Sequence, residues 1–478
     1  MLKKWLIAFC VLISVPALSQ EKWDLKKSVE YALANNISVK QQDIQAKLAE
    51  LTYHQSKLSK YPNLNFNTNL GVNTGRNIDR TTNQFTTAKT FYNTLGLQSN
   101  VDVFNFGSKK NTIQANLYEM QAAIAAVEKF KDDIALNVSG AYLQILLNRE
   151  LVAINRLQVK QTSSQLENTR KQVRAGSVPE LNAAQLDAQL ALDSSNLVSA
   201  IGLEQQSLLF LKALLNFDAG APFDIVTPPI GLIPVLSLAE LQPEMVYGLA
   251  LKNLPQQRVN SLRLLSAQKN ADAARGAMYP SVSLGAGIDT RYSSFKGNAD
   301  VTDIVFRGVN PIGFGIVKGT NDTVQQFAFD PVFRTYSDPY FSQLKNNFGT
   351  GAGFSVSVPI FNGGSAKTNW QRAKLNIRNY ELLQEQDKLN LKNDIYKAYT
   401  DAVTSLQKFN ASVKAIEAAQ KAYDFSVKRF DIGLLNPLDL ITAQSNLFRV
   451  QLEKNFAQFD YVFKMKVLEF YKGEGLKL

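Results

Sequence analysis

The sequence has almost none of the side chains that bind metals or carry out redox chemistry. Its 478 residues include one cysteine, Cys10, and one histidine, His54. One of each permits neither an internal disulfide nor a zinc site built from paired histidines. A Ser–His triad would need His54 in a pocket, of which the sequence gives no sign, so we interpret His54 as a helix-surface residue. We therefore expect no enzyme, no cofactor and no metal site.

The first residues are expected to be an export leader. Lys3 and Lys4 precede an apolar stretch from Trp5 to Val15, and Ala17-Leu18-Ser19 supplies small residues for a signal peptidase. We predict a signal peptide over residues 1–19, cleaved after Ser19, which would also remove Cys10. The alternative, an N-terminal membrane anchor, is disfavoured because the run is too short to span a bilayer.

Long apolar runs and clustered charge are also missing. No apolar run of about 18 residues follows the leader, so a membrane-embedded part would have to be made of strands. The formal net charge is +11, but Lys and Arg are interspersed with Glu and Asp along helical stretches, which is typical of solvated helix surfaces and not of a nucleic-acid site. The glycines at 349–353 and 363–364 match neither a phosphate-binding loop nor a dinucleotide motif.

The chain repeats itself. Tyr61-Pro62 recurs as Tyr279-Pro280 at an offset of 218, whereas Gly176 recurs as Gly433 at an offset of 257. The 39-residue difference between these offsets indicates an insertion in the second half. We predict a first repeat over 20–220, an extended proline-rich linker over 221–236 and a second repeat over 237–478.

Two very long helices are predicted, over 107–175 and 364–431, because apolar residues recur there at steps of three and four. Glycine and proline follow each one, at Gly176 to Pro179 and Gly433 to Pro437, and should end it. Helices over 180–215 and 438–471 would then complete two helical hairpins. A second apolar stripe on the first long helix favours a closed ring of helices over an ordinary dimeric rod.

Four segments alternate between polar and apolar residues and predict strands of about 10 to 12 residues. One pair is expected within about 62–103, and the other at 280–293 and 348–360 with a long loop at 294–347. Aromatic residues flank these strands at two levels: Tyr61, Phe104, Tyr279 and Phe361 at one, and Phe91, Tyr92, Tyr292 and Phe348 at the other. Such rows are typical of the two interfaces of a membrane barrel.

The polar residues of these strands would face a water-filled lumen. They are Asn63, Asn65, Asn67, Asn69, Gln98, Asn100, Asp102, Ser281, Ser283 and Asp289. Four strands cannot close a barrel, and open sheet edges are not tolerated in lipid. The smallest closed arrangement with a wide lumen has twelve strands, so we predict a homotrimer.

Several motifs resemble the TolC-type outer-membrane efflux family over the whole chain after the leader. Tyr61-Pro62-Asn63-Leu64 and Tyr279-Pro280-Ser281-Val282 lead into strands, and Val358 to Gly364 leaves the last one. The resemblance implies a mostly α-helical membrane protein: a periplasmic α-barrel of coiled-coil helices joined to a 12-stranded trimeric β-barrel in outer-membrane lipid. It also implies a periplasmic adaptor protein and an inner-membrane pump, either proton-driven or ATP-driven.

The resemblance also places a periplasmic gate at the hairpin tips. Known members close this mouth with a Tyr, an Arg and two Asp, where this chain has Phe430, Leu435, Asp439 and Thr442. We hypothesise an apolar constriction from Phe430 and Leu435 and a ring of three Asp439 carboxylates that favours cations. In the alternative, Asp439 only caps a helix. Gly176, Pro179, Glu180 and Gly433 would form the turns at this mouth.

One rival function remains open at this level. A secreted coiled-coil scaffold or adhesin with a soluble β head would show the same helical and strand periodicities, but it would extract without detergent. Within the channel interpretation the cargo, a small molecule or a protein, is not encoded in any motif that we identify.

Overall fold

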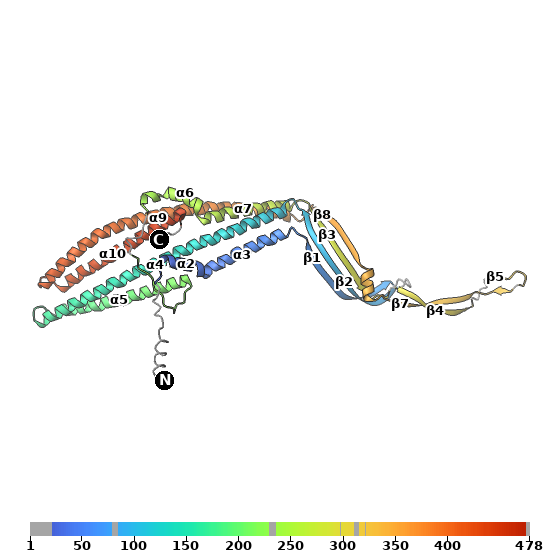
Figure 1. Cartoon of the computed structure of the whole chain (residues 1–478), viewed down its shortest axis with the longest axis horizontal. Coiled ribbons are helices and arrows are strands. Elements are labelled where there is room, and N and C mark those ends of the chain that lie inside the picture. Colours follow the sequence, from blue (N-terminus) through green and yellow to red (C-terminus); the bar gives the residue numbers. More distant parts are fainter. Residues whose placement is uncertain are drawn as a thin grey trace, which may run out of the picture. The chain divides into compact units, whose positions relative to one another are not determined.

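The structure is a computed structural model that describes residues 22–78, 85–228, 236–296, 298–309, 315–320 and 322–474 (Figure 1). The described residues divide into two compact units. The helical unit comprises those of Met1–Tyr53, Gln114–Gln268 and Lys374–Leu478, and the strand unit comprises those of His54–Ile113 and Lys269–Ala373. The predicted leader, 1–19, and residues 229–235 of the predicted linker lie outside the described residues.

Helices make up most of the described chain. They are α2 (Leu25–Asn35), α3 (Ile37–Leu58), α4 (Ser108–Arg174), α5 (Glu180–Leu215), α6 (Pro243–Asn253), α7 (Pro255–Gly276), α8 (Tyr340–Asn346), α9 (Ser365–Asp431) and α10 (Pro437–Glu469), with the short helices η2 (Leu238–Leu241) and η3 (Phe470–Glu474). The long helices α4 and α9 each have 67 residues, where the sequence predicts helices over 107–175 and 364–431. None of the described helices has the length and hydropathy needed to cross a bilayer.

Both long helices end in the same glycine turn. Gly176 and Gly433 adopt left-handed backbone conformations with φ of +72° and +76°. Their amides donate to Val173 O and Phe430 O, so carbonyl groups at each helix end keep hydrogen-bond partners. The next helix of each hairpin begins four residues after the glycine, α5 after Pro179 and α10 after Asn436.

The strand unit contains one antiparallel four-stranded sheet with strand order β1-β2-β3-β8. Its strands are β1 (Asn63–Ile78), β2 (Phe85–Phe104), β3 (Ser281–Ser293) and β8 (Gly349–Ser357). The expected strand length of 10 to 12 residues is wrong for the first pair, since β1 has 16 residues and β2 has 20. The cause is the threonine-rich end of β2, which keeps pairing with β1 as far as Ile78↔Phe85.

The predicted loop at 294–347 contains regular structure. It holds β4 (Asn298–Val309) paired with β7 (Phe327–Tyr336), the two-residue strands β5 (Gly315–Ile316) and β6 (Thr323–Val324), and helix α8. Helix α8 packs on the end of β3, where Gln343 donates to Ser293 O and Thr290 donates to Leu344 O.

Two of the apolar cores of the helical unit are formed mainly by the first and by the second repeat, respectively. One core contains Tyr142, Ile145, Leu211 and Leu215, and the other contains Ile395, Met465 and Leu468. The start of the predicted linker is extended and packs on the first core. Its residue Ile225 is fully buried there and forms a parallel β-bridge with Trp23. Arg149 fastens this segment by donating to Ile225 O at 2.7 Å and pairing with Asp224.

Candidate functional site

All ten residues predicted to face a lumen lie on one face of the four-stranded sheet. The register pairs Asn63 with Asn100, Gly96 with Asp289 and Ser281 with Ser357. Directly paired residues and alternate residues along a strand share a face. This rule joins Asn63, Asn65, Asn67, Asn69, Gln98, Asn100, Asp102, Ser281, Ser283 and Asp289 into one surface, which we call the polar face.

Glycines give the polar face its shape. A Cβ atom on Gly71 would lie 2.5 Å from the hydroxyl oxygen of Tyr92, and one on Gly285 would lie 2.9 Å from Oδ1 of Asn100. These glycines therefore leave room for side chains of the neighbouring strand. Tyr92 belongs to the polar face, since it pairs with Gly71, so it lies at the predicted level beside Phe91 but on the opposite face of the sheet. The reason is that adjacent strand residues point to opposite faces.

The opposite face is apolar and largely exposed in the single chain. Phe66 pairs with Leu97 and Leu97 with Ile288, while Phe354 is 72% exposed. Aromatic side chains gather near both ends of the strands. Phe106 stacks on Tyr279 at a centroid distance of 5.0 Å and meets Phe104 edge to face at 4.8 Å. At the other end, Phe91, Tyr292 and Tyr340 lie 6.3 and 4.9 Å apart.

At the hairpin tips, Phe430 lies inside the protein. It is 9% exposed and packs with Leu166, Leu186 and Leu440 from the other three long helices. This packing does not support the constriction that the sequence assigned to Phe430, because the ring is enclosed by helices of its own chain. Leu435 is partly buried beside the same cluster.

Asp439 and Thr442 are exposed on the first turns of α10. The side chain of Asn436 caps this helix by accepting from the Asp439 amide at 2.9 Å, and its own amide group donates to Asp439 Oδ2 at 2.8 Å. A carboxylate at this position also interacts favourably with the helix dipole. The cap is therefore Asn436, and Asp439 lies in the first turn of α10 with its carboxylate open to solvent.

Behind the tips lies a buried polar cluster that the sequence analysis did not identify. Asp193 is 1% exposed and accepts hydrogen bonds from Gln158, Gln189 and Thr162 at 2.7 to 2.8 Å. Gln444 of α10 donates to Thr162 at 3.3 Å, which connects the second hairpin to the first. We call Thr162, Asp193 and Gln444 the buried polar layer. Its sequence signal is a seven-residue spacing on α4 through Asn148, Asn155, Thr162 and Thr169, all of them buried.

A second link between the hairpins lies nearby. Gln165 of α4 donates to the hydroxyl of Tyr423 on α9 at 3.2 Å. Burial raises the pKa of Tyr423 above its ordinary value, so this hydroxyl stays protonated at neutral pH. The hydroxyl of the buried Thr169 has no hydrogen-bond partner among the described residues. The hairpins thus meet through polar contacts as well as through the apolar cluster around Phe430.

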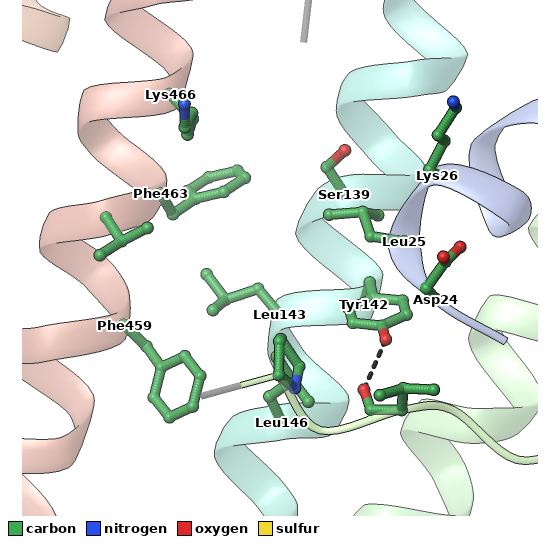
Figure 2. A pocket seen from close by; sticks show the side chains of 13 residues that line it. Asp24, Leu25, Lys26, Ser139, Tyr142, Leu143, Leu146, Phe459, Phe463 and Lys466 are labelled. Carbon is green, nitrogen blue, oxygen red and sulfur yellow. Dashed lines mark hydrogen bonds between the residues drawn. The ribbon is translucent and has the colours of Figure 1, made fainter. Parts of the chain in front are cut away.

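A cavity of 210 Å³ in the helical unit has a mostly apolar lining (Figure 2). Two of its charged side chains have structural partners, since Asp24 accepts from the Lys27 amide and Lys466 pairs with Glu469. Phe459 and Phe463 of α10 face Leu143 and Leu146 of α4 across the cavity. Its hydroxyl groups donate to the backbone, Tyr142 to Val226 O at 2.5 Å and Ser139 to Ala135 O at 2.7 Å. Within the described residues, no three His, Cys, Asp or Glu side chains gather in a way that could hold a metal ion.

Known proteins share this architecture. The solved structure of CusC superimposes with a TM-score of 0.75 and 19% identity, covering 95% of this chain and 93% of CusC. The sequence of Escherichia coli (strain K12) CusC, a cation efflux system protein, is 22% identical over 450 residues, covering 91% of this chain and 83% of CusC. These likenesses confirm the fold predicted from the sequence.

Two further relatives carry different descriptions. The probable outer membrane lipoprotein SilC of Salmonella typhimurium is 21% identical over 432 residues, covering 88% of this chain and 79% of SilC. The alkaline protease secretion protein AprF of Pseudomonas aeruginosa is 22% identical over 358 residues, covering 73% of this chain and 64% of AprF.

A family model settles the relationship that these pairwise likenesses suggest. The model of the outer membrane efflux protein family matches residues 29–216 and 246–463, most of the chain. The first matched stretch contains β1, β2, α4 and α5, and the second contains β3, β8, α9 and most of α10. The chain therefore belongs to the outer membrane efflux protein family, and it is an efflux channel of tripartite export systems and not an enzyme.

Proposed function

We propose that three copies of this chain form one passive export channel, with a shared twelve-stranded β-barrel in the outer membrane and the helical units in the periplasm. The observation that carries this proposal is the four-stranded sheet: β1 and β8 each have one neighbour in the sheet order, and the sheet has one polar and one apolar face. Copies of the sheet joined edge to edge would satisfy every strand. The apolar face then contacts outer-membrane lipid, and the polar face lines the lumen.

A pair of neighbouring residues on β8 tests this assignment of faces. Phe354 lies on the apolar face, and Ser355, paired with Ser283, lies on the polar face. We expect Phe354→Arg to reduce the amount of channel in the outer membrane, because a cation in the apolar layer costs about 2–4 kcal/mol at the membrane midplane. Ser355→Arg should insert normally and shift the ion selectivity toward anions in planar bilayers. Equal insertion of the two variants would contradict the face assignment.

The leader and the partners complete the proposal. Cleavage after Ser19 would give a mature chain that begins at Gln20. Mass spectrometry of the purified protein would reveal the cleavage site. An inner-membrane pump and a periplasmic adaptor would deliver the cargo and supply the energy for export. The descriptions of CusC and AprF name cations and a protease, so cargo is set upstream of a channel of this kind.

Because Phe430 is buried at the hairpin tips, the gate that we propose no longer includes its ring. We propose that the three Asp439 carboxylates face the periplasmic mouth and favour cations, with Thr442 one turn above them and Leu435 supporting the turn. Asp439→Asn keeps a polar group near Asn436 and removes only the charge. We expect this variant to reduce cation selectivity in single-channel recordings. Unchanged selectivity would leave Asp439 only a role in stabilising the first turn of α10.

A further inference from the structure

The insertion in the second repeat contains a hairpin with one strongly apolar face. Strand β4 pairs with β7 and with no other strand among the described residues. The register sets Val301 opposite Phe333, Phe306 opposite Phe329 and Val309 opposite Phe327. The members of this surface, which we call the apolar hairpin face, are Val301, Ile304, Phe306, Val309, Phe327, Phe329 and Phe333.

Two β-bulges bring these residues onto one face. The register shifts between Val301 and Asp303 and again between Phe306 and Gly308, so Thr302 and Arg307 are extra residues without an opposite partner. Without these bulges, the odd spacings from 301 to 304 and from 306 to 309 would place the apolar residues of β4 on both faces. The bulges therefore build a continuous apolar surface from an irregular sequence.

The two faces of the hairpin differ in charge. The seven side chains of the apolar hairpin face are each 40% to 61% exposed. The other face carries Asp300 opposite Arg334 and Val305 opposite Asp330, and Arg307 pairs with Asp330 at 3.4 Å. A two-stranded hairpin is marginally stable alone, and contiguous exposed apolar patches of this kind mark interaction sites. The apolar hairpin face is thus a surface that needs a partner.

We propose that the apolar hairpin face binds the same face of the hairpins from the other copies of this chain. The inference rests on the proposed trimer, in which three identical hairpins are tethered to one barrel mouth at a high effective concentration. A surface without charge can pack against copies of itself without placing like charges together. The charged opposite faces would remain in water.

Lipid is a poorer occupant for this face. Tyr292 ends the β3 side of the barrel strands, and Tyr340 follows β7; the two rings lie 4.9 Å apart. Aromatic residues at this level mark the interface between the membrane and water. In the proposed barrel, the segment between Tyr292 and Tyr340, which contains β4 and β7, would lie on the aqueous side of this aromatic row.

Neighbouring residues on β4 provide a matched test. Phe306 on the apolar hairpin face is 51% exposed in the single chain, and Val305 on the other face is 49% exposed. The Phe306→Cys and Val305→Cys variants would be made without Cys10, the only native cysteine. In purified trimers, we expect oxidation to cross-link Phe306→Cys chains and not Val305→Cys chains. Labelling by a charged maleimide should be at least tenfold slower for Phe306→Cys.

A second pair of variants guards against a local folding defect. Phe329→Cys and its opposite-face control Val332→Cys should give the same contrast. Absence of cross-links and equal labelling rates in a trimeric sample would overturn the inference and leave the channel function intact. Protection found only in lipid vesicles, without cross-links, would make lipid the occupant and would also overturn it. A monomeric sample would instead refute the proposed trimer.

Discussion

The long helices of the two helical hairpins have the same length and end in the same turn, but the interiors of the hairpins differ in polarity. Helices α4 and α9 both have 67 residues and both end in a left-handed glycine. At the repeat offset of 257, however, Asn155 corresponds to Ser412 and Thr162 to Ala419. The first hairpin buries the carboxylate of Asp193 against Thr162, whereas the second packs Ala419 against Leu447 and Val450.

This difference teaches that the repeat preserves backbone geometry and leaves the interior chemistry free to diverge. A buried polar group lowers stability relative to an apolar core but favours one register of packing helices. The buried polar layer also spans both hairpins through Gln444. The first hairpin therefore contributes a buried carboxylate that the second lacks, while side chains of both hairpins specify how the two fit together.

The largest expected effect is that of Asp193→Ala. The substitution leaves the Thr162 hydroxyl without its acceptor in a buried site, which costs about 1–3 kcal/mol, and the amides of Gln158 and Gln189 lose an acceptor as well. We expect a clearly lower unfolding temperature by circular dichroism. The double variant Asp193→Leu with Thr162→Val should recover only the part of this loss that comes from Thr162, because that hydroxyl and its acceptor are removed together. A single variant as stable as the native protein would refute the role of the layer.

Gln444→Leu should loosen the connection between the hairpins. The lost hydrogen bond to Thr162 is worth about 1 kcal/mol, which corresponds to about a fivefold shift between closed and open tips. We expect a larger open fraction in single-channel recordings. Leu447→Ala, a packing change inside the second hairpin alone, serves as the control and should lower stability without this gain. An unchanged open fraction in Gln444→Leu would show that the link does not hold the tips.

Substitution of the turn glycine should destabilise the two hairpins equally, since both turns have the same backbone conformation. Alanine in a left-handed conformation costs about 1 kcal/mol, and open space surrounds both Gly176 and Gly433, so no clash adds to this cost. We expect Gly176→Ala and Gly433→Ala to lower the unfolding temperature by equal amounts. Strongly unequal losses would mean that the turns are less alike than their backbones indicate.

The smallest effect concerns Asp132 on α4, whose counterpart at the repeat offset is Leu389. Burial, assisted by the nearby carboxylates of Glu128 and Asp133, raises the pKa of Asp132 to about 6. The folded protein therefore binds this proton more tightly than the unfolded chain, so lowering the pH from 7 toward 4 adds stability. Asp132→Asn should remove that gain from thermal unfolding curves measured across this range. A variant with the native pH dependence would contradict the assignment to Asp132.

Much of the architecture could be predicted because it follows from local periodicity. Steps of three and four marked α4 and α9, and strict alternation around Phe66 and Leu284 placed the polar residues of the sheet on one face. The glycine turns followed from Gly176 and Gly433. Each of these signals is contained in a short stretch of chain and needs no tertiary context.

The features that could not be predicted depend on contacts between segments that are distant in the sequence. Phe430 is buried only because Leu166 and Leu186 of the other hairpin cover it. In the sequence, Asp193 has the pattern of an exposed acidic residue. Its burial becomes evident only when the fold places Thr162 and Gln444 near it. The apolar hairpin face was hidden because the bulges at Thr302 and Arg307 break the alternation that a periodicity search requires.

The most direct test of the account is the stoichiometry of the purified mature protein, measured by native mass spectrometry after detergent extraction from outer membranes. We expect three copies of the chain, because only the joined edges of three four-stranded sheets close a barrel of twelve strands. A single copy that conducts ions in planar bilayers, or a monomer that stays dissolved without detergent, would contradict the account.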